Sequence, residues 1–216
     1  MKSVLVIGMG RFGKHLSRKM QELGNDVMII DKDEEKITEY ASEFTDSQIG
    51  DCRIEAVLQS IGVNNFDICF VAIGEDFQSS LEITALLKDL NAKWVVTKAS
   101  SDIQKKLLLR IGADEVVYPE RDTAEKLAIR SNAKNIFDYI QLTDEYSIYE
   151  IPIINSWVGK TIIELAIRRK YKVNIIAVKN ANSLDPVPSP LYTFKEGDHI
   201  IVIGKSSDVF KLTSLT

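Results

Sequence analysis

The first 118 residues alternate between short apolar runs and segments whose apolar residues recur at helical spacing. Near-continuous Val/Ile runs are typical of parallel strands that are buried on both faces, and the spaced segments are typical of amphipathic helices. Strands that alternate with helices predict an α/β fold with a doubly wound parallel sheet. We expect six strands, at residues 4–7, 27–30, 46–49, 68–72, 94–97 and 115–118.

The pattern changes in the second half of the chain. A helical stretch follows residue 119, and strands are then expected at 148–153, 173–178 and 199–203, with a short helix at 161–167 and a helical tail. Residues 184–190 contain three prolines, which exclude a helix or a central strand there. We therefore expect two domains: residues 1–142, which include the helix that leads out of the sheet, and a smaller α+β domain at residues 143–216.

A glycine-rich motif follows the first predicted strand and opens a helix. It reads Gly8-Met9-Gly10-Arg11-Phe12-Gly13. In this context Gly8 permits the tight turn, Gly10 lets a phosphate approach the backbone, and Gly13 lets the helix pack on the strand. The positive end of the helix favours the phosphates. The motif predicts a Rossmann-like site for an adenine nucleotide.

The second predicted strand ends at Asp31, 18 positions after Gly13. A carboxylate at this place accepts hydrogen bonds from ribose hydroxyls, and it would repel a 2′-phosphate. We therefore expect unphosphorylated adenosine ligands such as ATP, ADP or NAD(H), and not NADP.

Further candidates follow the other strands, because open α/β sheets bind ligands at the carboxyl ends of their strands. Each has a structural alternative. Arg11 could contact a phosphate or lie in solvent, Asp51 could contact the nucleotide or cap the next helix, and Glu120 could hold a divalent cation or stabilise a helix N-terminus. The remaining candidates are Cys52 after the third strand, Ala72, Ile73 and Gly74 after the fourth, and Lys98 after the fifth.

Composition and charge exclude several classes of protein. The chain has 216 residues, 45% of them hydrophobic, and 27 basic against 31 acidic residues give a net charge of −4. This balance does not favour a nucleic-acid binder. The two cysteines form no CxxC pair, so no zinc site or disulfide framework is expected, and reduced thiols fit the cytosol. No apolar run is long enough to span a membrane, and the N-terminus does not resemble a signal peptide.

Catalytic residues are not evident. The only histidines are His15, in the first predicted helix, and His199, at the start of a strand, and neither belongs to a nucleophile–base set. Catalysis is therefore not expected. The alternative from another class is a small NAD-dependent oxidoreductase, in which the second domain would have to supply an acid or base to the nicotinamide.

A basic run, Arg168-Arg169-Lys170-Tyr171-Lys172, ends the predicted helix of the second domain. Cations are favoured at a helix C-terminus and are normally solvated there. Alternatively, the run forms an anion pocket with the strand that follows it and with the proline-rich loop.

The whole chain resembles the RCK family (regulators of potassium conductance), most closely its KtrA type. The motifs that carry the resemblance are Gly8–Gly13, the acidic stretch that begins Asp31-Lys32-Asp33, Val71-Ala72-Ile73-Gly74, Gly112-Ala113-Asp114 with Pro119-Glu120, Asp144–Ser147, Gly159-Lys160-Thr161 and Glu196-Gly197-Asp198.

The resemblance implies a cytoplasmic regulatory subunit that assembles as a dimer-based octameric ring and gates a membrane potassium-transporting subunit of the KtrB type. ATP and ADP would compete in the first domain, NAD(H) binds some members, and cyclic di-AMP binds the second domain of Gram-positive relatives. The implied roles are a terminal-phosphate contact for Arg11, a ligand to Mg²⁺ or Ca²⁺ for Glu120, and a nucleotide contact for Lys32. The implied cyclic-dinucleotide pocket comprises Arg169, Asn174, Ile175, Ile176 and Pro188.

Overall fold

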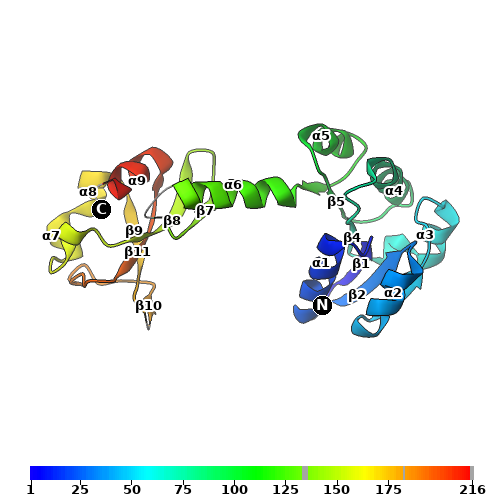
Figure 1. Ribbon diagram of the computed structural model, residues 1–216, viewed down its shortest axis with the longest axis horizontal. Coiled ribbons are helices and arrows are strands. Elements are labelled where there is room, and N and C mark those ends of the chain that lie inside the picture. The colour runs from blue at the N-terminus through cyan, green and yellow to red at the C-terminus, as the bar shows by residue number, and fades with distance from the viewer. Residues whose placement is uncertain (133–135, 182, 215–216) are drawn as a thin grey trace. The chain divides into compact units, whose positions relative to one another are not determined.

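The computed structural model describes residues 1–132, 136–181 and 183–214. The chain divides into two compact units, Met1–Arg121 and Asp122–Thr216. Figure 1 follows their elements along the chain. Within the described residues, no helix is long and apolar enough to cross a membrane.

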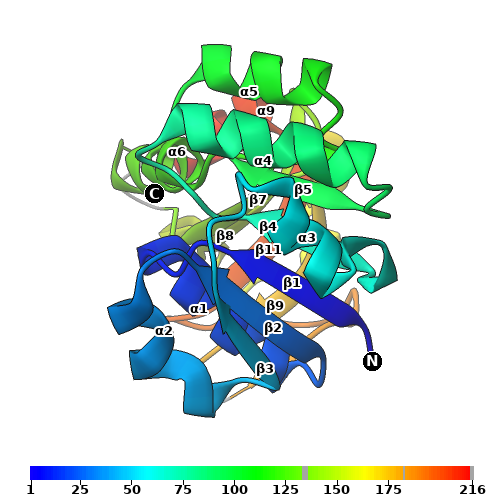
Figure 2. The same ribbon diagram turned by 90° about the vertical axis from the view of Figure 1, so that its right-hand side faces the viewer.

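The first unit is built on an entirely parallel sheet with strand order β3-β2-β1-β4-β5-β6, the order of a doubly wound fold. Figure 2 shows this sheet with helices packed against it. The six predicted strands are confirmed within a residue or two at each end. They are β1 (Ser3–Ile7), β2 (Asp26–Asp31), β3 (Asp46–Ile49), β4 (Ile68–Val71), β5 (Val95–Lys98) and β6 (Glu115–Val117).

Alternating side chains of β1 enter two hydrophobic cores. Val4 and Val6 pack with residues of α1 and α2 on one face, and Leu5 and Ile7 pack with residues of α3 and α4 on the other. Because both faces are covered, β1 is apolar throughout. The helices are α1 (Arg11–Glu22), α2 (Glu34–Tyr40), α3 (Glu55–Ile61), α4 (Phe77–Asp89) and α5 (Asp102–Arg110), with 3₁₀ turns η1 (Ala41–Glu43) and η2 (Val63–Asn65).

The second unit is built on an antiparallel sheet of order β10-β9-β11-β8-β7. Trp157, Phe194 and Leu212 belong to the core that the sheet shares with its helices. The strands are β7 (Asp138–Gln141), β8 (Tyr146–Pro152), β9 (Asn174–Lys179), β10 (Leu184–Asp185) and β11 (His199–Lys205). The helices are α7 (Ile162–Leu165), α8 (Ile167–Tyr171) and α9 (Ser206–Thr213), with the 3₁₀ turn η3 (Asn155–Trp157).

The division between the units differs from the boundary expected at residue 142. Helix α6 (Pro119–Asn132) contains the division, since Arg121 is the last residue of the first unit. Strand β7 pairs with β8, so residues 138–141 belong to the second sheet. Strand β7 was not predicted, because its short sequence mixes polar and apolar residues and forms a strand only by pairing with β8.

The helix expected at 161–167 is two short helices. Ala166 lies between α7 and α8 in the left-handed region with φ +47°, and this interrupts the helical hydrogen bonding. Thr161 begins α7 with a capping box, in which Thr161 and Glu164 exchange side-chain-to-backbone hydrogen bonds.

Candidate functional site

An open cleft of about 940 Å³ lies along the carboxyl ends of the strands in the first unit. It brings together most of the residues that the sequence proposed for nucleotide binding. The lining includes Gly8, Gly10, Arg11, Phe12, Asp31, Lys32, Asp51, Cys52, Ala72, Ile73, Gly74, Lys98 and Glu120.

The three glycines of the motif have three different surroundings. Gly8 has φ +99°, and its N–H donates to the Ile30 carbonyl at 2.8 Å, so the turn is tied to β2. A side chain at Gly10 would meet nothing within 4 Å. A Cβ at Gly13 would lie 1.9 Å from the Gly8 carbonyl oxygen. Gly13 does not line the cleft; it allows α1 to approach the glycine loop, and Gly10 leaves open space for a ligand in front of the helix.

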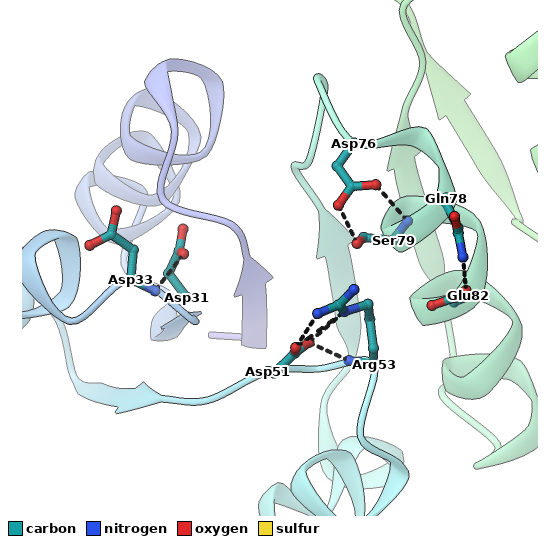
Figure 3. A network of polar contacts seen from close by, with 8 residues as sticks. All are labelled: Asp31, Asp33, Asp51, Arg53, Asp76, Gln78, Ser79 and Glu82. Carbon is teal, nitrogen blue, oxygen red and sulfur yellow. Dashed lines mark hydrogen bonds and ion pairs between the residues drawn. The ribbon is translucent and has the colours of Figure 1, made fainter.

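Asp31 holds the glycine loop in place. One carboxylate oxygen accepts a hydrogen bond from the Met9 N–H at 2.7 Å. The other accepts from the Asp33 N–H at 3.0 Å (Figure 3). The Nζ of Lys36 lies 3.9 Å from Oδ2 of Asp31. Because each carboxylate oxygen has two acceptor positions, Asp31 retains capacity for ribose hydroxyls. The residue present therefore fits the predicted role.

Asp51 does not cap the following helix, so that alternative is wrong. The N-cap of α3 is Ile54, which supplies no side-chain acceptor. Instead, Asp51 accepts hydrogen bonds from the Arg53 N–H at 3.0 Å and from the Arg53 guanidinium, whose Nη2 lies 2.6 Å from Oδ2. This arginine lowers the pKa of Asp51 to about 2. The Asp51 carboxylate is thus engaged by Arg53 ahead of the helix.

Cys52, next to Asp51, is buried, and burial raises the pKa of its thiol to about 12. Such a thiol is neutral at physiological pH and unsuited to nucleophilic chemistry. Cys52 contributes an apolar wall to the cleft.

Lys98, at the end of β5, and Glu120 form an ion pair in the lining of the cleft, with 2.6 Å between Nζ and Oε1. The Lys98 side chain is 12% exposed and Glu120 is 60% exposed. Lys98 lowers the pKa of the Glu120 carboxyl. Glu120 is the second residue of α6, as the helix-terminus alternative predicted. Arg11 forms no ion pair within the described part of the chain, so its guanidinium is available to a ligand.

Arg53 and Asp76 are among the lining residues of the cleft that were not foreseen. Arg53 pairs with Asp51, and Asp76 caps α4 by accepting from the Ser79 N–H at 3.1 Å (Figure 3). Asp76 could have been found from its position directly before a helical segment. Arg53 could not, because an arginine two residues after an aspartate occurs in many solvated loops.

A second pocket, of about 530 Å³, lies in the second unit. Of the five residues proposed for a cyclic dinucleotide, Arg169, Asn174, Ile175 and Pro188 line it. Ile176 does not. Ile201 of β11 pairs with Ala177 of β9, and the next residue, Val202, pairs with Ile175. The pairing therefore changes register at Ile176, which has no partner on β11.

Other titratable groups do not form a reactive set. His199 Nδ1 lies 2.8 Å from Glu150, in an ion-paired cluster with Lys179 on the second sheet. In the portions of the chain that the structure describes, no three His, Cys, Asp or Glu side chains gather as a metal site.

Comparison with known proteins agrees with the residues and the fold. The TrkA-N domain model matches residues 4–119, and the TrkA-C domain model matches residues 148–215. The Ktr system potassium uptake protein C of Bacillus subtilis is 39% identical over 96% of this chain and 94% of its own length. The Ktr system potassium uptake protein A of the same organism is 36% identical over the same shares.

Among solved structures, the GsuK channel bound to NAD superposes with a TM-score of 0.70 at 19% identity. The match covers 96% of this chain but 38% of the channel chain, and it shows the common fold. The relatives confirm the resemblance to the potassium-conductance regulators, and they agree with the expectation that the chain is not an enzyme. Both family models match in order along one chain, and the chain belongs to the TrkA-N/TrkA-C family of potassium uptake proteins.

Proposed function

We propose that this chain is a nucleotide-binding regulatory subunit that acts at the cytoplasmic face of a membrane potassium transporter of the KtrB type. One observation carries the proposal: the open space at Gly10, the N-terminus of α1 and the carboxylate of Asp31 border the same cleft. These are the features that bind the phosphates and the ribose of an adenine nucleotide.

The ligands of this cleft are ATP and ADP, which compete for it. Asp31 accepts the ribose hydroxyls, and the backbone of the glycine loop approaches the phosphates. Arg11 has a guanidinium without an ion-pair partner among the described residues and contacts the terminal phosphate of ATP. NAD(H) fits the same features, as the NAD-bound GsuK channel suggests by its fold.

Glu120 and Lys98 make the binding of a phosphate in the cleft depend on a divalent cation. A phosphate attracts Lys98 and repels Glu120, which is mostly exposed beside it. The Glu120 carboxylate would hold a divalent cation, Mg²⁺ or Ca²⁺, whose charge would offset this repulsion. No three His, Cys, Asp or Glu side chains gather as a metal site in the described residues, so the further oxygen ligands would come from the phosphates.

Nucleotide control requires two shapes of the assembly that ATP and ADP stabilise unequally. We assign these shapes to a dimer-based octameric ring of this chain, whose change of shape gates the transporter. Helix α6 contains the division between the two units and carries Glu120, which lines the cleft, in its first turn. It is therefore the element through which a change at the phosphates reaches the second unit.

The first test compares ATP with ADP. Arg11→Ala should weaken ATP by roughly ten- to a hundredfold, because a charge-assisted hydrogen bond contributes about 1.5–3 kcal/mol. ADP, which lacks the third phosphate, should lose much less. Asp31→Ala should weaken both nucleotides. Isothermal titration calorimetry measures these affinities.

Thermal unfolding of Asp31→Ala serves as the control, since this carboxylate also holds the Met9 and Asp33 N–H groups. Equal losses of ATP and ADP affinity in Arg11→Ala would place Arg11 away from the terminal phosphate. Unchanged affinities in Asp31→Ala would contradict the ribose assignment.

The pocket of the second unit is the proposed site for cyclic di-AMP. Arg168 and Arg169 line it together with apolar side chains, among them Ile175 and Pro188. A cyclic dinucleotide presents two phosphates and two purines, and a pocket shared across a two-fold axis supplies each contact twice. We expect one ligand per dimer.

Arg169→Ala should abolish binding of cyclic di-AMP and leave ATP affinity unchanged, because the two cavities belong to different units. Calorimetric titration with each ligand measures both affinities. Lys170→Ala is a matched control, since Lys170 belongs to the same basic run but does not line the pocket. The absence of any heat with the wild-type protein would remove cyclic di-AMP from the proposal, and the basic run would be a solvated helix end.

A further inference from the structure

The cleft has an end that neither the phosphates nor the ribose account for. The glycine loop follows β1, and Asp31 is the last residue of β2. The strand next to β2 on its other side is β3. A nucleotide whose phosphates and ribose follow this order has its base beside the loop after β3. That loop contains Asp51, Cys52 and Arg53, and all three line the cleft.

Arg53 is held in one orientation at this end. Its Nε lies 3.0 Å from Asp51 Oδ1, and its Nη2 lies 2.6 Å from Oδ2, in a two-pronged pairing. Its backbone N–H also donates to Asp51, which closes a short turn. The side chain is still 41% exposed. A planar guanidinium is thus fixed by its edge while part of its surface remains open to the cleft (Figure 3).

The charges around Arg53 do not favour a phosphate. Asp51 is paired with it, and the carboxylates of Asp76 and Glu82, from α4 and its N-cap, are near enough to raise the pKa of Arg53 further. Lys32 is the other cation that acts on Asp51 and Asp76. Three carboxylates therefore face two cations here, whereas an anion site needs an excess of positive charge.

A neutral aromatic ring fits this end of the cleft. Cys52 and Ile83 are buried side chains that contribute apolar walls to it. A guanidinium is weakly hydrated on its faces and stacks on aromatic systems, and a partner that fixes its edge reduces the entropy lost on stacking.

We infer that Arg53 stacks on the nucleobase and favours purines over pyrimidines, with Asp51 holding its guanidinium in place. This rests on the proposed binding of nucleotides in the cleft. It adds a contact that acts on the base and is independent of the number of phosphates.

The experiment compares ADP with CDP, which share ribose and phosphates and differ in the size of the base. In the wild-type chain ADP should bind more tightly. Arg53→Ala should weaken ADP roughly 3- to 30-fold, as the loss of a cation–π stack predicts. It should affect CDP less, so the ADP-to-CDP preference falls. ATP, ADP and AMP should lose the same factor.

Two variants separate stacking from charge. Arg53→Lys keeps the charge but loses the plane and the paired donors, so it should behave like Arg53→Ala. Arg11→Ala should leave the ADP-to-CDP preference unchanged. Thermal unfolding of each variant confirms that it is folded, as expected for an exposed loop residue.

Several results would overturn the inference. One is an ADP affinity of Arg53→Ala equal to that of the wild type, and another is an ADP affinity fully retained in Arg53→Lys. A third is a loss of affinity in Arg53→Ala that grows from AMP to ATP, which would mean that Arg53 attracts phosphate at long range. If the wild-type chain bound no adenine nucleotide, the proposed function would fail together with this inference. If the wild-type chain bound adenine nucleotides and Arg53→Ala bound them with the same affinity, only this inference would be overturned.

Discussion

Gly10 and Gly13 belong to one motif but are required for different reasons. The Gly10 backbone is extended, with φ −71° and ψ −175°, a conformation open to any residue, and a side chain there would meet only empty space. A Cβ at Gly13 would instead overlap the Gly8 carbonyl oxygen. Gly10 leaves space for a ligand, whereas Gly13 is required for α1 to pack against the glycine loop.

This difference gives a matched pair of variants. Gly13→Ala should destabilise the first unit by about 1–3 kcal/mol or more, because the extra methyl group forces α1 away from the glycine loop. Gly10→Ala should unfold at nearly the wild-type temperature but weaken ATP about tenfold or more, because the methyl group occupies the space of a phosphate. Thermal unfolding and calorimetry measure the two effects. Equal stability of the two variants would contradict this division of roles.

The start of α6 is fixed by ion pairs to two other elements of the first unit. Glu120 pairs with Lys98 at the end of β5, and Arg121 pairs with Asp102 at the start of α5. In each pair the carboxylate is mostly exposed, and such pairs contribute little to stability, about 0–1 kcal/mol. Their importance lies in position, since Lys98 and Glu120 both line the cleft.

Replacement of Glu120 by glutamine tests this element. Without divalent cations, Glu120→Gln should bind ATP more tightly than the wild type, because a carboxylate that repels phosphate is lost and Lys98 is released. With Mg²⁺ present, the wild type should gain more affinity than the variant. Calorimetry with Mg²⁺ and with a chelator measures both. An equal response of both proteins to Mg²⁺ would exclude Glu120 as a cation ligand.

The proposed regulation requires that the nucleotide change the shape of an assembly. A ligand shifts an equilibrium between two shapes only through unequal affinity for them. We expect an oligomer well above a dimer, with dimensions that differ between ATP and ADP. Small-angle scattering with each nucleotide measures this, and Arg11→Ala should reduce the difference. A monomer with both nucleotides would refute the regulatory ring.

The amino-acid pattern alone predicted the fold of the first unit and the place of its candidate site. The parallel sheet follows from the apolar strands, since Val4 and Leu5 point to opposite faces and both are buried. The glycine motif and Asp31 were predicted correctly in position because they act through local backbone geometry, next to the strand ends that precede them. These features depend on neighbours in the sequence, which a pattern can reveal.

Which groups a polar side chain contacts and which strands pair are visible only in the folded chain. Asp51 has the residue type of a helix cap, but Ile54 takes the N-cap position of α3 and the Asp51 carboxylate pairs with Arg53. Strand β7 exists through its pairing with β8, and the change of register between β9 and β11 lies at Ile176, which is not in the pocket. The two strand features depend on pairing between separate segments, whose free energies local sequence patterns do not contain. The role of Asp51 depends on where α3 begins, at Ile54.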